Sequence, residues 1–296
     1  MRRVLGGGAA ACLVAALGAG VPATTAAAPV RLCNGLQATI VGTAGDDHLV
    51  GTDGDDVIVA LAGDDGIESG AGDDTVCGNG GSDQVFDLGG DDVVIGGDGD
   101  DSVIAGEGHD VVRLGAGKDY FDLYGDPGPV DLWLGPGDDA FALWLPAGGS
   151  VNAGPGDDDL NIVTVPGVPA TLIGGEGLDL LTLRVDESPD TSPVYISERT
   201  ATLRLGRGPR GRMRGWESYL LFGDHDWVYR GTNGKDAVAA LDGRLRAHLY
   251  GGDDFAQVRG VGPHYIDAGS GSDYVDGSPR YAVCVAAEFG ACSPNP

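Results

Sequence analysis

The chain has 296 residues, with 18 lysines and arginines against 45 aspartates and glutamates, and a formal net charge of -27. Such an excess of negative charge excludes a protein that attracts nucleic acid through its overall charge, because phosphate groups would be repelled. Glycine contributes 54 residues, which makes ordering the chain costly in conformational entropy and requires a compensating source of stability.

The N-terminal segment MRRVLGGGAAACLVAALGAGVPATTAAAPV combines two arginines, an apolar alanine-rich core and a stretch of small residues. This pattern predicts a secretory signal peptide over residues 1–28. The apolar core is interrupted by glycines and is short for a membrane anchor, and we find no second apolar run of spanning length. We therefore expect a secreted, extracellular protein with no membrane span after cleavage, and an N-terminal cap over residues 29–41.

Residues 42–122 form nine consecutive nonapeptides: GTAGDDHLV, GTDGDDVIV, ALAGDDGIE, SGAGDDTVC, GNGGSDQVF, DLGGDDVVI, GGDGDDSVI, AGEGHDVVR and LGAGKDYFD. The fourth position is always glycine, the sixth always aspartate, and the eighth always large and apolar, from Leu49 to Phe121. A fixed glycine marks a tight turn, and an apolar residue between tolerant positions fits a short strand with its middle side chain inward. A turn and a strand in every copy predict a solenoid whose stacked coils share one thin core.

The nonapeptide resembles the GGxGxDxUx repeat of the RTX, or haemolysin-type calcium-binding, family. The resemblance implies an all-β fold, a parallel β-roll or β-helix solenoid with two nonapeptides in each coil and several calcium ions between successive coils. Each ion would take one carboxylate from each of two coils, together with main-chain carbonyls, which suits a hard cation with six to eight oxygen ligands. The implied ligands are Asp47, Asp65, Asp83, Asp101 and Asp119 in one column, and Asp56, Asp74, Asp92 and Asp110 in the other.

Four copies depart from the family pattern. Leu61, Asp87 and Leu88 stand at positions 1 or 2, and His109 and Lys118 at position 5. We expect the sites at these copies to be the weakest, out of about seven at most in this block. The alternative for the aspartates is a solvated acidic face, or Asx turns without metal. Turn chemistry alone does not require aspartate at every sixth position, so we favour calcium.

Residues 123–276 keep the theme but lose the strict period, and residues 277–296 would form a C-terminal cap. Related turns recur as GPGDDAF, GPGDDDL, GGEGLDLL, GTNGKDAV, YGGDDFA and AGSGSDYV, about two nonapeptides apart. We expect the same solenoid to continue, with one coil per motif and calcium-type turns on one side only. Plain β-helix turns with incidental aspartates are the alternative. The candidate ligands here are Asp139, Asp158, Asp179, Asp236, Asp254 and Asp273.

A loop and basic insertion interrupts this half near residues 186–215. DESPDTSP has the composition of a loop, and VYISERTATLRLGRG alternates as strands or a hairpin would. The basic cluster that follows could bind an extracellular glycan or cell-surface polymer, or pair with carboxylates of adjacent coils, and we favour pairing. Its members are Arg204, Arg207, Arg210, Arg212 and Arg214. The tryptophans could stack on carbohydrate, but a thin solenoid needs large side chains in its core and caps.

Without the signal peptide four cysteines remain: Cys33, Cys77, Cys284 and Cys292. An even number in an exported chain argues for disulfides, but three pairings are possible and the sequence alone does not choose among them. We prefer Cys33 with Cys77 and Cys284 with Cys292, because each pair then ties a terminal segment to the nearest part of the solenoid or to itself. The start of the chain also resembles exported bacterial proteins of this repeat family, which supports the first pair.

The sequence contains no HExxH helix, GxSxG turn or P-loop. The five histidines are scattered singly, and we expect them to be exposed or to cap turns. Carboxylate pairs abound, but calcium explains them, so they do not indicate an active site. We therefore predict a calcium-binding, structural protein and not an enzyme, which folds on binding calcium outside the cytoplasm. The alternatives are a calcium-dependent surface adhesin, or a β-helix that acts on polysaccharide in its second half.

Overall fold

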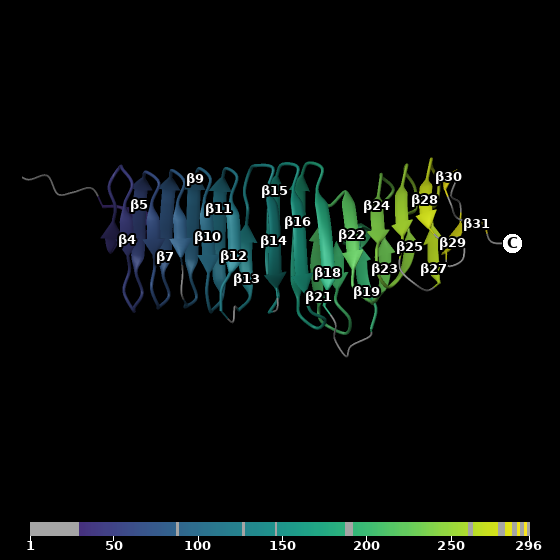
Figure 1. Cartoon of the computed structure of the whole chain (residues 1–296), viewed down its shortest axis with the longest axis horizontal. Coiled ribbons are helices and arrows are strands. Elements are labelled where there is room, and N and C mark those ends of the chain that lie inside the picture. The colour runs from purple at the N-terminus through teal and green to yellow at the C-terminus, as the bar shows by residue number, and fades with distance from the viewer. Residues whose placement is uncertain are drawn as a thin grey trace, which may run out of the picture. The chain divides into compact units, whose positions relative to one another are not determined.

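The computed structural model describes residues 30–86, 89–125, 128–145, 147–186, 192–259, 263–277, 282–285, 289–290 and 293–294. The predicted signal peptide and Cys292 lie outside these ranges. Residues Arg31–Pro296 form one compact unit, in which the regular structure is almost entirely β-strand. Figure 1 shows the strands of this unit stacked side by side from β4 to β31. The prediction of an all-β solenoid is confirmed.

Three sheets build the coils, and their strands are parallel except at the basic insertion. One sheet, sheet 1, runs the length of the unit, and two others follow each other along the opposite side, where β14 lies next to β12. Sheet 1 contains β3 (Ile40–Val41), β5 (Val57–Ala62), β7 (Thr75–Gly80), β9 (Val93–Asp98), β11 (Asp110–Ala116), β13 (Val130–Trp133), β15 (Gly149–Pro155), β17 (Ala170–Glu176), β21 (Arg210–Arg214), β20 (Thr202–Arg204), β19 (Val194–Ser197), β23 (Asp226–Arg230), β25 (Arg244–His248), β27 (His264–Asp267), β29 (Ala282–Val285) and β31 (Ser293–Pro294). Sheet 2 contains β4 (His48–Val50), β6 (Gly66–Glu68), β8 (Gln84–Phe86), β10 (Ser102–Ala105) and β12 (Tyr120–Leu123). Sheet 3 contains β14 (Ala140–Leu145), β16 (Asp159–Thr164), β18 (Leu180–Val185), β22 (Ser218–Phe222), β24 (Ala237–Ala240), β26 (Phe255–Val258), β28 (Tyr274–Gly277) and β30 (Phe289–Gly290).

The strand register follows the nonapeptide. Val57 pairs with Thr75 and Thr75 with Val93, so neighbouring strands of a sheet are two nonapeptides apart. The eighth residue of each copy points between the sheets: Ile58, Val76 and Val94 are fully buried, and Leu49 in the first copy is partly buried. The eighth-position side chains of successive coils thus build a continuous thin core, which no isolated repeat could form.

The fourth-position glycine has two structural reasons. Gly99 has a φ of 130°, a region that side chains disfavour, and a Cβ at this position would lie 2.2 Å from the carbonyl oxygen of Gly81 in the preceding coil. Coils stack through these turns so closely that no side chain fits between them. Gly80 lies beside this turn, yet its Cβ would meet nothing within 4 Å.

The second half winds in the same way with longer coils. Ala140 pairs with Asp159 and Asp159 with Leu180, so the turns named in the sequence each open one coil. The basic insertion adds β19, the 3-10 helix η1 (Glu198–Thr200) and β20, with β19 and β20 antiparallel as a hairpin. Sheet 1 continues through this hairpin from β17 to β21, β20, β19 and β23.

The N-terminal segment is fixed by a disulfide. Strands β1 (Leu32–Cys33) and β2 (Leu36–Gln37) form an antiparallel pair, and Cys33 bonds to Cys77 on β7 with a Cα–Cα distance of 5.8 Å. This pair was predicted. Cys284 is also disulfide-bonded, and its predicted partner lies outside the described residues. The predicted boundaries of the caps and of the two solenoid blocks stay predictions.

Several side chains lie where the sequence did not place them. Trp216 and Trp227 are buried as expected, but Trp144 is 50 % exposed because it occupies an outward position of β14. We expected the histidines to be exposed or to cap turns: His225 is buried at the bend before β23, and His264 is buried with its Nδ1 accepting a hydrogen bond from the backbone N–H of Leu245 at 3.1 Å. None of the helices in the described part of the chain has the length and apolarity that crossing a membrane requires.

Candidate metal centre

The sixth-position aspartates line up in two rows. Each aspartate directly precedes a strand, so stacking the strands stacks the carboxylates. Row A follows the starts of the sheet 2 and sheet 3 strands, and row B the starts of β5, β7, β9 and β11. Row A contains Asp47, Asp65, Asp83, Asp101, Asp119, Asp139, Asp158, Asp179, Asp236, Asp254 and Asp273, and row B contains Asp56, Asp74, Asp92 and Asp110.

One oxygen of most of these carboxylates accepts a backbone N–H from the preceding coil. Asp101 Oδ1 accepts the backbone N–H of Asp83 at 2.9 Å, and Asp74 Oδ1 accepts that of Asp56 at 2.7 Å. The same contact recurs in the second half, where Asp158 accepts the N–H of Asp139 at 3.0 Å. An N–H donated to a carboxylate is a charge-assisted bond, stronger than one between neutral groups. From Asp47 to Asp119 in row A and from Asp56 to Asp110 in row B these bonds recur without a break, so they form ladders that join successive coils.

The other carboxylate oxygen is buried without a hydrogen bond in most of row A. Among the described residues this holds for Oδ2 of Asp65, Asp83, Asp101, Asp119, Asp158, Asp179, Asp254 and Asp273, and for Oδ1 of Asp139. A buried acceptor without a partner costs about 1–3 kcal/mol, and more when it is charged. The repetition of this defect along one line of the molecule indicates that a ligand completes it.

Main-chain carbonyls surround these oxygens. A Cβ built on Gly96 would lie 2.4 Å from Asp101 Oδ2 and 2.4 Å from the carbonyl oxygen of Leu114, and Gly78 lies in the same way between Asp83 Oδ2 and the carbonyl of Gly96. The first-position glycine thus keeps open a space bordered by oxygen atoms. Hard oxygen donors of this kind suit Ca²⁺.

No group of three or more His, Cys, Asp or Glu side chains with metal-holding geometry occurs within the described ranges. A site between two carboxylates of these rows would take its other ligands from the backbone. The family resemblance implies this composition.

The rows are costly to ionise without a cation. Burial, reinforced by repulsion from neighbouring carboxylates, raises the pKa of Asp101, Asp110 and Asp139 from 3.8 to about 7, and a backbone N–H bond opposes this rise for Asp101 and Asp110. The pKa of Asp74 and Asp254 rises to about 6 for the same reasons. Closely spaced buried carboxylates that resist losing their protons are groups that a divalent cation would stabilise.

Threonines hold the first aspartate of each row. The backbone N–H of Thr43 donates to Asp47 Oδ2 at 2.5 Å, and both the N–H and the hydroxyl of Thr52 donate to Asp56 Oδ2 at 2.8 Å. Burial acts to raise the pKa of Asp56, but these bonds and that from Thr39 outweigh it, so the pKa is lowered. In these first copies the threonine thus donates a hydrogen bond to the carboxylate oxygen that has no hydrogen-bond donor further along row A. In the sequence, the dipeptide GT in place of GG marks these positions. It was the available signal for these hydrogen bonds, which we did not predict from the sequence.

A second, exposed series of carboxylates runs beside the rows and was also missed. The fifth-position aspartate accepts a backbone N–H from the following coil, whereas the sixth-position aspartate accepts one from the preceding coil. Asp100 accepts the N–H of Lys118 at 2.9 Å, and Asp73 accepts that of Asp91 at 3.0 Å. The doublet DD in most copies was the available signal. His109 and Lys118 keep the backbone N–H of this contact but supply no carboxylate of their own.

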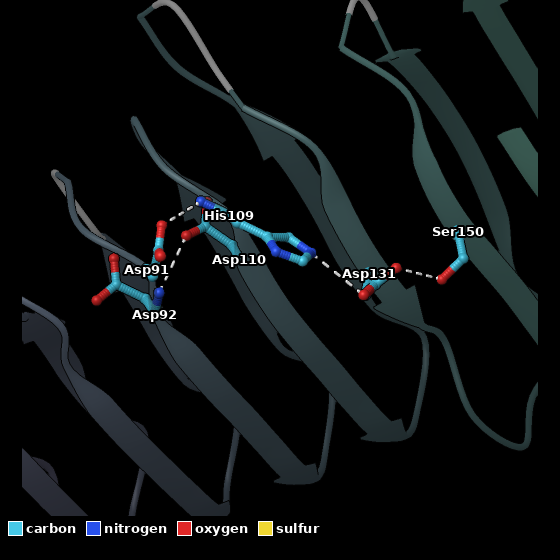
Figure 2. A network of polar contacts seen from close by, with 6 residues as sticks. All are labelled: Asp91, Asp92, His109, Asp110, Asp131 and Ser150. Carbon is cyan, nitrogen blue, oxygen red and sulfur yellow. Dashed lines mark hydrogen bonds and ion pairs between the residues drawn. The ribbon is translucent and has the colours of Figure 1, made fainter. Parts of the chain in front are cut away.

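Row B ends at Asp110, as Figure 2 shows. Asp110 Oδ1 accepts the N–H of Asp92 at 3.3 Å, but the next coil brings β13 and no aspartate turn. Instead, His109 Nε2 lies 3.2 Å from Asp131 Oδ2, and Asp131 Oδ1 accepts the hydroxyl of Ser150. Beyond Asp110 the contacts of His109, Asp131 and Ser150 take the place of row B. The second half therefore has aspartate turns only along row A, as expected.

Row A changes composition at the basic insertion. Asp179 donates its N–H to Glu217 Oε2 at 2.8 Å, so a glutamate stands where a sixth-position aspartate would be. Burial and the charges of Asp236 and Glu217 raise the pKa of Glu198 to about 8, and the hydroxyl of Tyr219 donates to Glu198. The row restarts at Asp236, whose Oδ2 accepts the N–H of Thr232 at 2.9 Å. Neither glutamate was among our candidates, because neither lies in a repeat motif.

The basic cluster differs from our expectation. In the described part of the chain, Arg204, Arg210, Arg212 and Arg214 form no ion pair with the adjacent coils, whereas Arg244 binds Asp226 with two contacts of 2.6 Å. Arg207 donates to Ser192. Arg210, Arg212 and Arg214 lie at exposed positions of β21, and Arg204 is half-buried on β20.

Comparison with protein families agrees with the geometry. Four overlapping copies of the RTX calcium-binding nonapeptide repeat match residues 41–76, 50–85, 78–112 and 86–121. The recognition of RTX-type repeats is confirmed, and residues 41–121 are a block of these repeats. No curated protein matches the chain. These repeats suggest calcium binding in a β-roll over residues 41–121.

Proposed function

We propose that this protein is secreted, binds several calcium ions along rows A and B, and folds as it binds them. The observation that carries the proposal is the line of buried carboxylate oxygens without partners. The aspartates of both rows would hold the ions, each between two successive coils, with main-chain carbonyls completing the ligands. A bound calcium supplies positive charge where buried carboxylates repel, so its binding free energy contributes to the stability of the fold.

Export is supported by one feature of the sequence, one of the structure and the calcium concentration outside the cell. The first 28 residues have the pattern of a signal peptide. The bond between Cys33 and Cys77 fits an oxidising compartment. Extracellular calcium is about millimolar, within the range in which extracellular calcium modules bind. In a low-calcium cytoplasm the repulsion within the rows would keep the first block loose.

A calorimetric calcium titration of residues 29–296, with circular dichroism recorded in parallel, tests this proposal. We expect several ions to bind while the β signal rises, and magnesium at the same concentration to have little effect because it prefers a smaller octahedral site. A circular dichroism spectrum that is the same in chelator and in millimolar calcium would overturn calcium-coupled folding.

A second candidate function is binding of a surface polymer by the second half, as an adhesin does. Arg204, Arg210, Arg212 and Arg214 favour it, because they form no ion pair with the described residues and lie together on β20 and β21. We propose binding and not catalysis, because the paired carboxylates of the chain are accounted for by the calcium rows.

A further inference from the structure

One outward face of sheet 1 is cationic although the chain is strongly acidic. Ten of the 18 lysines and arginines lie between residues 199 and 246. Strand pairing places Arg204 directly opposite Arg210, Tyr195 opposite Arg204, and Ser197 opposite Arg230. Three arginines from β20, β21 and β23 therefore surround one place on the sheet.

A groove of about 410 Å³ occupies this place. Its polar lining comes from Ser197, Thr200, Thr202, Arg204, Arg210 and Arg230, and no acidic residue borders it. The guanidinium of Arg204 lies over the ring of Tyr195, 4.2 Å from its centroid, which fixes its orientation. Arg210 and Arg230 are exposed. The groove thus combines one guanidinium stacked on Tyr195, two exposed guanidinium groups and several hydroxyl groups.

The groove arginines lack the partners that other arginines of the chain have. Arg184, Arg244 and Arg259 each pair with an aspartate, but across the described ranges Arg204, Arg210 and Arg230 pair with none. Like charges directly opposite on neighbouring strands destabilise a sheet, and Arg204 faces Arg210 in this way. An arrangement that costs stability and leaves the charges uncompensated indicates an anionic ligand.

We propose that this groove binds an acidic polysaccharide. A guanidinium matches a carboxylate or sulfate group with two parallel hydrogen bonds, and the threonine and serine hydroxyls suit the hydroxyls of a sugar. The charges of such a polymer are spaced apart, so one or two of them can bind in the groove without approaching the acidic turns. Nucleic acid carries a phosphate at every nucleotide, and its neighbouring phosphates would be repelled by those turns. The inference deepens the second candidate function above and rests on it.

Calorimetry in millimolar calcium tests the inference with polymers that share one backbone: carboxymethyl dextran, dextran sulfate and neutral dextran, with oligothymidylate as a fourth probe. The test variant carries Arg204→Gln, Arg210→Gln and Arg230→Gln. The control carries Arg113→Gln, Arg184→Gln and Arg259→Gln, which change the net charge equally outside the groove. We expect charged dextrans to bind, neutral dextran not to bind, and the test variant to bind at least about tenfold more weakly, while the control binds as wild type. Preference for carboxymethyl dextran or for dextran sulfate would identify carboxylate or sulfate as the group bound.

Arg210→Glu alone provides a second test should the triple variant not fold, because Arg210 is exposed and has no packing role. It should abolish binding while leaving the calcium-dependent circular dichroism signal intact. Equal losses in both triple variants, no binding of either charged dextran by the folded protein, or tighter binding of oligothymidylate would each overturn the inference. The dichroism signal keeps this result separate from calcium-coupled folding, which fails only if that signal does not respond to calcium.

Discussion

Replacing Asp101 by asparagine should change the stability of the protein in opposite directions with and without calcium. Asparagine keeps the Oδ1 acceptor for the N–H of Asp83 and removes the buried charge. Burial raises the pKa of Asp101 from 3.8 to about 7. At about 1.4 kcal/mol per pKa unit, ionising this group costs the fold up to about 4 kcal/mol at pH 8. Solvent at the turn screens the charge, so we expect the variant to gain about 1–3 kcal/mol in chelator.

In calcium the same variant should be destabilised, because Asp101 would contribute to the ions on both sides of its coil. Urea unfolding followed by circular dichroism, in chelator and in millimolar calcium, measures both effects, and calorimetry should count two fewer strongly bound ions. Asp100→Asn is the matched control. It removes the same charge one residue away, from an exposed carboxylate that accepts the N–H of Lys118, and should leave the ion count unchanged. Destabilisation of Asp101→Asn in both conditions would refute the reasoning.

Three further predictions concern the turns, the pH and the disulfide. Gly99→Ala should lower the free energy of unfolding in calcium by at least about 2 kcal/mol, because alanine is strained at the φ of Gly99 and its Cβ would meet the Gly81 carbonyl. The control Gly80→Ala should be nearly neutral, because its Cβ meets nothing. Equal urea midpoints for the two variants would contradict this prediction. In chelator, the β signal in circular dichroism should be greatest near pH 4 and decline as the pH rises to about 7. The pKa of Asp110 is raised in the folded state, so over this range the folded state keeps protons that the unfolded state has lost, and rising pH favours unfolding. A β signal that rises from pH 4 to pH 7 would contradict this prediction. Reducing or replacing the Cys33–Cys77 bond, which joins residues 44 apart, should cost about 4 kcal/mol by thermal or urea unfolding; an unchanged midpoint would show that the N-terminal cap does not need it.

The rows could be predicted from the sequence because they are periodic. Once Gly81 and Gly99 stack at a spacing of two nonapeptides, Asp83 must lie beside Asp101, and no knowledge of distant segments is needed. The same reasoning carried into the second half, because a turn such as GPGDDDL still opens one coil there.

What the sequence did not predict depends on contacts between segments that share no period. Glu217 enters row A because an insertion of irregular length brings it beside Asp179. The outward direction of Arg204 is set by the antiparallel hairpin of β19 and β20, and pairing with acidic turns was the wrong expectation for it. Trp144 is exposed because the core of its coil is filled by Leu143 and Leu145.

The strand register also determines the order in which the chain can wind. From β3 to β17 every coil touches the coil before it, and each pairing joins residues about twenty apart, as Gly149 with Ala170. Contacts this local form without a long search, so a chain that emerges from a pore N-terminus first can add coil after coil onto a finished template. The next pairing, Thr171 with Arg212, spans twice that distance, and the extra loop closure costs about 0.6 kcal/mol. Folding should therefore slow at the insertion. The RTX block can be fully folded before the hairpin of β19 and β20, and the cationic groove that it carries, has formed.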